Sequence, residues 1–458
     1  MLAHPVHRAR PACSGQALIP ALLLLSLCGV AWAALYNLGQ VAAARTHLTH
    51  AADAAAYSAA LEQTRTLNLL AYINRAQIAH QVAMAHLVTL ATWAKFSNTE
   101  MQRHSMGNPP AYLIGSLFGA KAQMAYMAGR STGGAADEAA RAYQAHDDLV
   151  HDTLLHSARQ AVSALPRQRE EMIQAVLRAN YPELQGQPQT LQWRVLTDGW
   201  PGYARSRSGE ALRPLVYAAA GRYDFLQPRN FTRTSNWVVE KACPQKRHEL
   251  RRRGETRMDG SGNWSSFDSL SYHALRWNKW IGCYYREYPM GWGLTGDRMD
   301  GDIVQRAPED FSSEDFWRWV SSNTSWNIFS GISNPLADAY AWMDSASPRG
   351  RGLPDSYEIS SADEAAPLRF AIAVRQQAAS LPVSGGASRI AWAGAYAWRA
   401  FQPNEGLSVS AATETYFARP QSRGDGKDEK PTLFRPYWQA HRATANASEE
   451  SMAHGAMR

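Results

Sequence analysis

Charge is missing from the first part of this 458-residue sequence. Residues 11–44 contain no Asp, Glu, Lys, Arg or His, and residues 17–35 are almost wholly apolar. As a helix, the latter stretch spans about 28 Å, close to the hydrocarbon thickness of a bilayer. Arg8 and Arg10 precede it, so the positive-inside rule predicts a cytoplasmic N-terminus with the bulk of the chain exported.

Two fates are open for this apolar segment. Ala31-Trp32-Ala33 resembles a signal-peptidase site, and cleavage there would release the chain. Apolar residues continue past it through Leu35 and Leu38, which favours a retained anchor. We therefore expect residues 1–14 in the cytoplasm and a transmembrane helix over residues 15–38. No other apolar run in the sequence reaches spanning length.

Only four cysteines are present, and they fall into two pairs with different expected environments. Cys13 and Cys28 lie before or within the apolar segment, whereas Cys243 and Cys283 would both be exported. An oxidising compartment makes the last two a natural disulfide pair, with two buried free thiols as the alternative. Closing a loop of this size would contribute about 4 kcal/mol on the chain-entropy model.

Composition predicts a folded, basic exported part. The chain is 45% hydrophobic with a net charge of +7, a mean hydropathy of −0.39 and a pI near 9.2. A basic protein suits an anionic cell envelope. Export argues against nucleic acid as a partner. The apolar segment over residues 17–35 makes the lipid bilayer the first partner that we expect.

Glycine and proline are absent between Gly39 and Gly107. A single helix of that length would run about 100 Å, although a break near residues 64–68 is equally compatible with the pattern. Further helices are expected, bounded by Asn108-Pro109-Pro110, by the RSTGGAA stretch and by Pro166. We expect them at residues 111–127, 135–165 and 166–179. The whole of residues 39–180 reads as a helical stalk region.

After Tyr181 the sequence changes to short runs that alternate large apolar with polar side chains, and ten of the sixteen tryptophans fall between residues 190 and 330. Such runs predict antiparallel strands. We expect them at residues 190–196, 234–242, 248–258, 263–275, 280–288, 388–401 and 407–420. The fold class is then α+β, with residues 181–442 forming a Trp-containing, β-rich periplasmic domain and residues 443–458 a disordered tail.

The sequence contains candidate catalytic and metal-binding motifs, but the residues around them do not predict the structure that each motif requires. Residues 129–133 satisfy G-x-S-x-G, but a helix rather than a strand precedes the serine, so no nucleophile elbow is expected. His146, His151 and His156 are spaced by five and would point to different sides of a helix. We expect no enzyme, no cofactor and no small-molecule substrate. A periplasmic enzyme with a hidden site remains a rival.

The densest basic run is Lys246, Arg247 and residues 251–253. A solvated strand edge protected by charge is the ordinary interpretation. Contact with anionic lipid headgroups or cell-wall polymers is the alternative. The tryptophans could likewise form a sugar-binding platform, but most are expected in the core.

The N-terminal region carries a family resemblance. Gly15-Gln16-Ala17 stands before the apolar helix, and after a spacer comes the block Ala51-Ala52-Asp53-Ala54-Ala55-Ala56. Over residues 14–60 this arrangement resembles the TadE/TadG-like proteins of the Flp (tight-adherence) pilus. The resemblance implies an envelope protein that acts as a minor pilin or as a pilus-anchoring assembly factor. Its partners would be other pilus-assembly proteins of the inner membrane and periplasm.

The resemblance also implies a prepilin-type processing site between Gly15 and Gln16. In such pseudopilins a glutamate usually stands five residues after the glycine, whereas this sequence has Pro20. An unprocessed assembly protein fits better than a filament subunit. We therefore expect a single-pass, non-catalytic inner-membrane component of Flp pilus assembly. The rival is an adhesin-like binding module released by cleavage after Ala33.

Alanine dominates the start of the stalk, with ten alanines among residues 42–60. Small side chains let neighbouring helices approach closely. We expect Ala52, Asp53 and Ala56 to form a helix contact surface for assembly, with Asp53 free for one polar contact. Packing of this block on the chain's own domain is the alternative.

Overall fold

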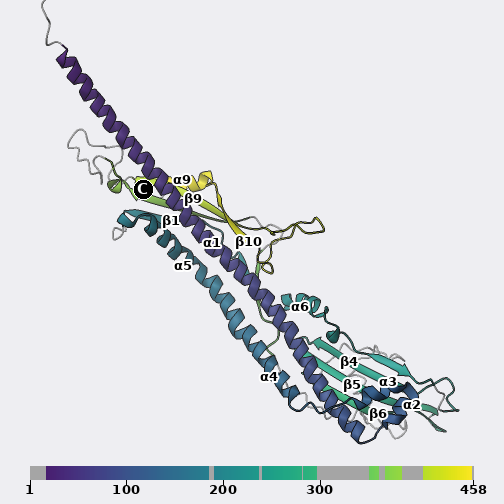
Figure 1. Cartoon of the computed structure of the whole chain (residues 1–458). Coiled ribbons are helices and arrows are strands. Elements are labelled where there is room, and N and C mark those ends of the chain that lie inside the picture. The colour runs from purple at the N-terminus through teal and green to yellow at the C-terminus, as the bar shows by residue number, and fades with distance from the viewer. Residues whose placement is uncertain are drawn as a thin grey trace, which may run out of the picture.

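One long helix organises the molecule in the computed structural model (Figure 1). The structure describes residues 17–184, 190–236, 240–280, 282–296, 350–360, 367–383 and 406–455. Helix α1 (Leu18–Ser105) has 88 residues, a length of about 130 Å. No interruption occurs at residue 38 or at residues 64–68, so of the two alternatives left open by the sequence the structure has the single helix.

A second helical arm returns along α1. Two short helices follow the end of α1, α2 (Ala111–Phe118) and α3 (Ala120–Met127), separated by Gly119 at φ +92°. That left-handed conformation favours glycine and divides the helix expected over residues 111–127. Then α4 (Ala135–Asp148), a π-helical turn (Leu149–Leu154) and α5 (Leu155–Asn180) run antiparallel to α1 (Figure 1).

Pro166 lies inside α5, so the boundary predicted there is wrong. A proline costs a helix one hydrogen bond and crowds the preceding turn. The cost is offset by packing, because Leu165 and Ile173 on the same helix are fully buried in two successive cores beside α1. Tertiary contact therefore overrides the local signal.

Two four-stranded antiparallel sheets lie at different positions along α1. The proximal sheet has the order β1-β8-β9-β10 and the distal sheet the order β3-β4-β5-β6. The proximal strands are β1 (Leu191–Asp198), β8 (Leu368–Gln377), β9 (Gly406–Phe417) and β10 (Trp438–Ala443). The distal strands are β3 (Phe231–Thr234), β4 (Glu249–Met258), β5 (Trp264–Asn278) and β6 (Gly282–Thr295).

Smaller elements connect the sheets. β2 (Ala204–Arg207) pairs with β7 (Ser356–Ile359), and α6 (Arg213–Ala220) packs on the distal half of α1, in the core that includes Val82 and Val88. Short 3₁₀ turns occur at Pro182–Leu184, Gly209–Leu212, Asp224–Leu226 and Ala378–Ser380. The expected α+β class is correct.

Most strand predictions are confirmed, as β1, β4, β5, β6 and β9. The strand predicted at residues 234–242 is wrong for the described residues beyond Thr234, which form turns or irregular backbone. The strand predicted at residues 388–401 lies outside the described residues.

The expected stalk region (39–180) and the expected β-rich domain (181–442) pack against each other along α1. Successive cores along α1 each combine its side chains with the returning arm or with sheet residues from the second half of the chain. Leu48 shares a core with Ile372 of β8, Leu67 shares one with Trp438 of β10, and Val88 shares one with Trp264 of β5. The helix and the sheets therefore share their hydrophobic cores.

Buried amides of α1 bind the backbone of distant segments. The Asn74 amide donates to the carbonyls of Tyr357 and Leu433, both at 2.7 Å. Asn68 donates to the Trp438 carbonyl at 3.0 Å and accepts from its N–H at 3.1 Å. Since an unpaired buried backbone group is costly, these amides let irregular chain lie against the helix.

Two glycines let β6 approach α1 closely. A Cβ at Gly293 would stand 2.2 Å from the Thr92 carbonyl, and one at Gly291 would stand 3.0 Å from Glu100 Cβ. At the same place Thr99 Oγ1 lies 2.6 Å from the Trp292 carbonyl and 2.7 Å from its N–H. The helix thus covers an edge strand whose backbone would otherwise be open to other chains.

The expectation of a disordered tail over residues 443–458 is wrong for its described part. Helix α9 spans Ala447–Gly455, and Asn446 and Glu449 exchange side-chain to N–H hydrogen bonds at 2.9 Å as a capping box. Glu449, whose side chain is 1% exposed, pairs with Arg369 of β8 at 2.7 Å. That ion pair lowers the pKa of Glu449 and holds the tail on the proximal sheet.

Candidate assembly surface

The N-terminal end of α1, from Leu18, projects from the body as an exposed apolar stem (Figure 1). An 18-residue window here has a mean hydropathy of 2.3, and none of it is buried. By length and composition the stem can cross a bilayer, and a signal sequence would share these properties. Its large side chains, 50–75% exposed, are Leu18, Ile19, Leu22, Leu23, Leu24, Leu25, Leu27, Val30, Trp32, Leu35 and Leu38.

The stem ends where aromatic residues give way to the folded body. Trp32 is 75% exposed and Tyr36 37%, whereas Asn37 and Leu48 are buried. Tryptophan and tyrosine are enriched at membrane–water interfaces. A bilayer around residues 17–35 would thus have its surface near Tyr36, with the proximal sheet directly beside it.

Ala52 and Ala56 lie in the chain's own core. Both are fully buried, together with Phe370 and Ile372 of β8 and Ile173 of α5. Their small size lets the helix lie close to the sheet. Ala52 and Ala56 therefore pack on the chain's own domain, as the alternative interpretation predicted. This alanine face is not exposed to another chain.

Asp53 is likewise engaged within the chain. Its carboxylate pairs with the Arg442 guanidinium of β10. Burial raises the pKa of Asp53, and Arg442 opposes the rise. The free polar contact expected of this residue is thus occupied. Gly15 and Gln16, the expected processing site, lie outside the described residues.

A different face of α1, which was not predicted from the sequence, is exposed over most of its length in the described part of the chain. This face, the α1 stripe, repeats every three to four residues as Ala54, Tyr57, Leu61, Arg65, Leu69, Tyr72, Ala76 and Ala79. Leu69 is 46% exposed and Tyr72 59%. Two exposed arginines lie on this face: Arg65, which is paired with Glu62 at 2.5 Å, and Arg75, about five helical turns after Tyr57. The sequence does carry a signal for this face, because its apolar residues form a second helical period that is out of phase with the buried one.

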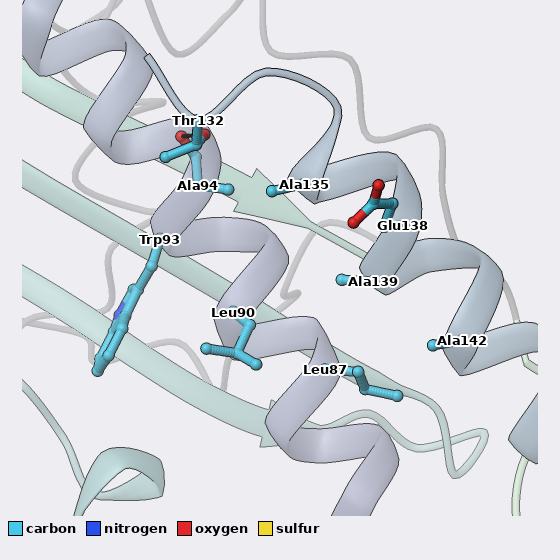
Figure 2. Close-up of a pocket in the computed structure, with 9 residues that line it drawn as sticks. All are labelled: Leu87, Leu90, Trp93, Ala94, Thr132, Ala135, Glu138, Ala139 and Ala142. Atoms are coloured by element: carbon cyan, nitrogen blue, oxygen red, sulfur yellow. Dashed lines mark hydrogen bonds between the residues drawn. The ribbon is translucent and has the colours of Figure 1, made fainter. Parts of the chain in front are cut away.

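Beyond the stripe, an open groove of about 530 Å³ lies between α1 and α4 (Figure 2). The lining residues are Leu87, Leu90, Trp93, Ala94, Thr132, Ala135, Glu138, Ala139 and Ala142. Alanines supply most of the α4 wall. Thr132 and Glu138 are its polar lining residues, and the other seven are apolar. Its shape and apolar lining suit the side chains of another helix.

The predicted disulfide between Cys243 and Cys283 is present. Their Cα atoms are 5.9 Å apart, within the range that a disulfide requires. It joins the loop before β4 to the start of β6, at the far end of the distal sheet. Cys28 is exposed on the stem.

The basic run on β4 does not form a solvated edge, so both interpretations of residues 251–253 are wrong. β4 is an inner strand. Arg252 pairs with the fully buried Asp268 at 2.5 Å and Arg251 with Glu249 at 2.6 Å. Arg253 donates to the Phe231 carbonyl at 3.0 Å. These charges are neutralised inside the sheet because the folded chain supplies their acceptors.

Together these features define an elongated α+β protein that carries one exposed apolar stem. A family model described as "Putative Flp pilus-assembly TadE/G-like" matches residues 15–62. The match covers the stem and the alanine-rich block, so the N-terminal region of the chain is TadE/G-like. No curated protein and no solved structure matches the chain.

Proposed function

We propose that this protein is a membrane-anchored, non-catalytic component of Flp-type pilus assembly. The observation that carries the proposal is the stem. It is apolar and exposed on all sides, it continues without a break into the folded body, and it lies within the TadE/G-like match. Exposed apolar surface of this extent is stable only in lipid or against another protein.

The proposed orientation has the N-terminus in the cytoplasm and the body in the periplasm. Arg8 and Arg10 precede the stem, as the positive-inside rule requires. The disulfide between Cys243 and Cys283 supports an oxidising compartment for the distal sheet.

The α1 stripe is the surface that we assign to a pilus-assembly partner. It lies on the same helix as the stem, so a second anchored helix leaving the same bilayer would run beside it. The groove between α1 and α4 extends this surface with small residues. Close helix approach at small residues is the usual geometry of such contacts.

Topology and N-terminal processing test the anchor. An export-dependent phosphatase fused to the C-terminus of the full chain should be active, and the chain should stay with the membrane after alkaline washing. Sequencing of the mature N-terminus separates the fates: Met1 supports an unprocessed anchor, Gln16 prepilin-type cleavage, and Ala34 the released adhesin-like module. A start at Ala34 would refute the proposal.

Photo-crosslinking tests the partner surface. A photoreactive amino acid at Tyr72, on the α1 stripe, should give an adduct with another anchored pilus-assembly protein, identified by mass spectrometry. The matched position is Ser163, which is exposed on α5 and is not part of the stripe. Equal adducts from both positions, or none from Tyr72, would show that the stripe is not the contact.

A further inference from the structure

The turn between β5 and β6 forms an exposed aromatic tip. Trp280 is 84% exposed and Trp277 49%, and Lys279 Nζ lies 5.0 Å from the centre of the Trp280 ring. Large aromatic side chains at the outer end of a strand pair are costly to leave in water. The distal sheet that carries them lies at the end of the molecule opposite the stem (Figure 1).

The disulfide brings a second basic segment to this tip. Cys283 lies directly opposite Trp277 in the β5–β6 register and is bonded to Cys243. The loop around Cys243 therefore lies against the hairpin. Its Lys246 Nζ is 5.8 Å from the centre of the Tyr285 ring. The covalent link orders both segments before any ligand binds.

Positive charge dominates the assembled surface, which we name the basic tip. It comprises the exposed Lys241, Lys246, Arg276 and Lys279 with Trp277 and Trp280. Among the acids whose side chains the structure describes, Glu240 and Glu249 lie on the neighbouring chain. Glu240 accepts from the Ala242 N–H at 3.2 Å, and Glu249 pairs with Arg251 at 2.6 Å.

We propose that the basic tip binds an anionic glycan of the cell envelope. Tryptophan faces pack on the apolar faces of sugar rings, and lysine and arginine pair with carboxylates. The bilayer that holds the stem is a poorer match, because α1 separates the two ends by about 100 Å. This surface is distinct from the stem and from the α1 stripe, so it adds an attachment point to the assembly function.

Co-sedimentation with purified peptidoglycan sacculi tests the proposal. The full chain, reconstituted in phosphatidylcholine nanodiscs, should sediment with sacculi, and less so as the salt concentration rises. The charge-reversed variant K246E/K279E should bind about tenfold more weakly or worse, the factor that 1.4 kcal/mol represents. Trp280→Ala should also weaken binding, without any change in charge.

The control carries the same change in charge elsewhere. K121E/K427E alters two exposed lysines outside the tip, on α3 and on the loop before β10, and should bind within about twofold of the wild type. Thiol labelling of each variant should find the Cys243–Cys283 disulfide intact. Equal loss in both double variants, equal binding to uncharged chitin, or binding to phosphatidylglycerol vesicles instead of sacculi would overturn the proposal.

Discussion

Glu100 tests how closely α1 packs on the distal sheet. Glu100 is buried there, with 7% of its surface exposed. It lies between Gly129, after α3, and Gly291 of β6: an added Cβ at either glycine would stand 3.0 Å from Glu100 atoms. Burial raises the pKa of Glu100 from 4.5 to about 7, although the Arg252 guanidinium opposes the rise.

This rise makes stability depend on pH in a defined direction. The folded protein binds the Glu100 proton more tightly than the unfolded chain does. The stabilisation of the folded state by the protonated Glu100 is therefore complete below pH 4.5, and it is lost as the pH rises through about 7. The difference between the two pKa values corresponds to about 3 kcal/mol of unfolding free energy above pH 7.

Glu100→Gln keeps the shape of the protonated acid and removes its charge. We expect the variant to be more stable than the wild type by about 3 kcal/mol at pH 8 and nearly equal to it at pH 4.5. Urea unfolding of the full chain in detergent, followed by tryptophan fluorescence at several pH values, measures both.

The control for this experiment is Glu138→Gln, which changes an exposed carboxylate on α4 and should have little effect at any pH. A Glu100→Gln difference that does not vary with pH would refute the linkage argument. So would a variant less stable than the wild type at pH 8.

Three further perturbations follow from the packing. Removing the disulfide with C243S/C283S should lower the unfolding free energy by about 4 kcal/mol in urea; an unchanged midpoint would contradict this. Gly293→Ala places a Cβ 2.2 Å from an α1 carbonyl and should cost about 1–3 kcal/mol, whereas Gly260→Ala, with open space, should not. Burial and the neighbouring His146 of α4 lower the pKa of His80. The stability of the wild type should therefore fall as the pH drops below 6.5, and thermal unfolding should show a smaller fall for His80→Gln.

Local patterns in the sequence determined the elements that depend on few neighbours. The absence of glycine and proline after Gly39 predicted α1, and alternation predicted β4, β5 and β6. The apolar stem followed from hydropathy, since exposed apolar side chains need no fold to be recognised. The cysteine pairing followed from compartment and elimination.

Only the tertiary structure decided which faces are occupied. Alanine spacing cannot show whether Ala52 and Ala56 meet another chain or their own sheet, because small side chains suit both. The sequence suggested that the arginines of β4 are solvated, because local sequence does not show that β5 and β3, which supply the acceptors of Arg252 and Arg253, lie beside β4. Pro166 stays helical for the same reason: long-range packing outweighs a local cost of about 3 kcal/mol. Burial is a property of the assembled chain, so the free surfaces of α1 and of the basic tip emerged only with the fold.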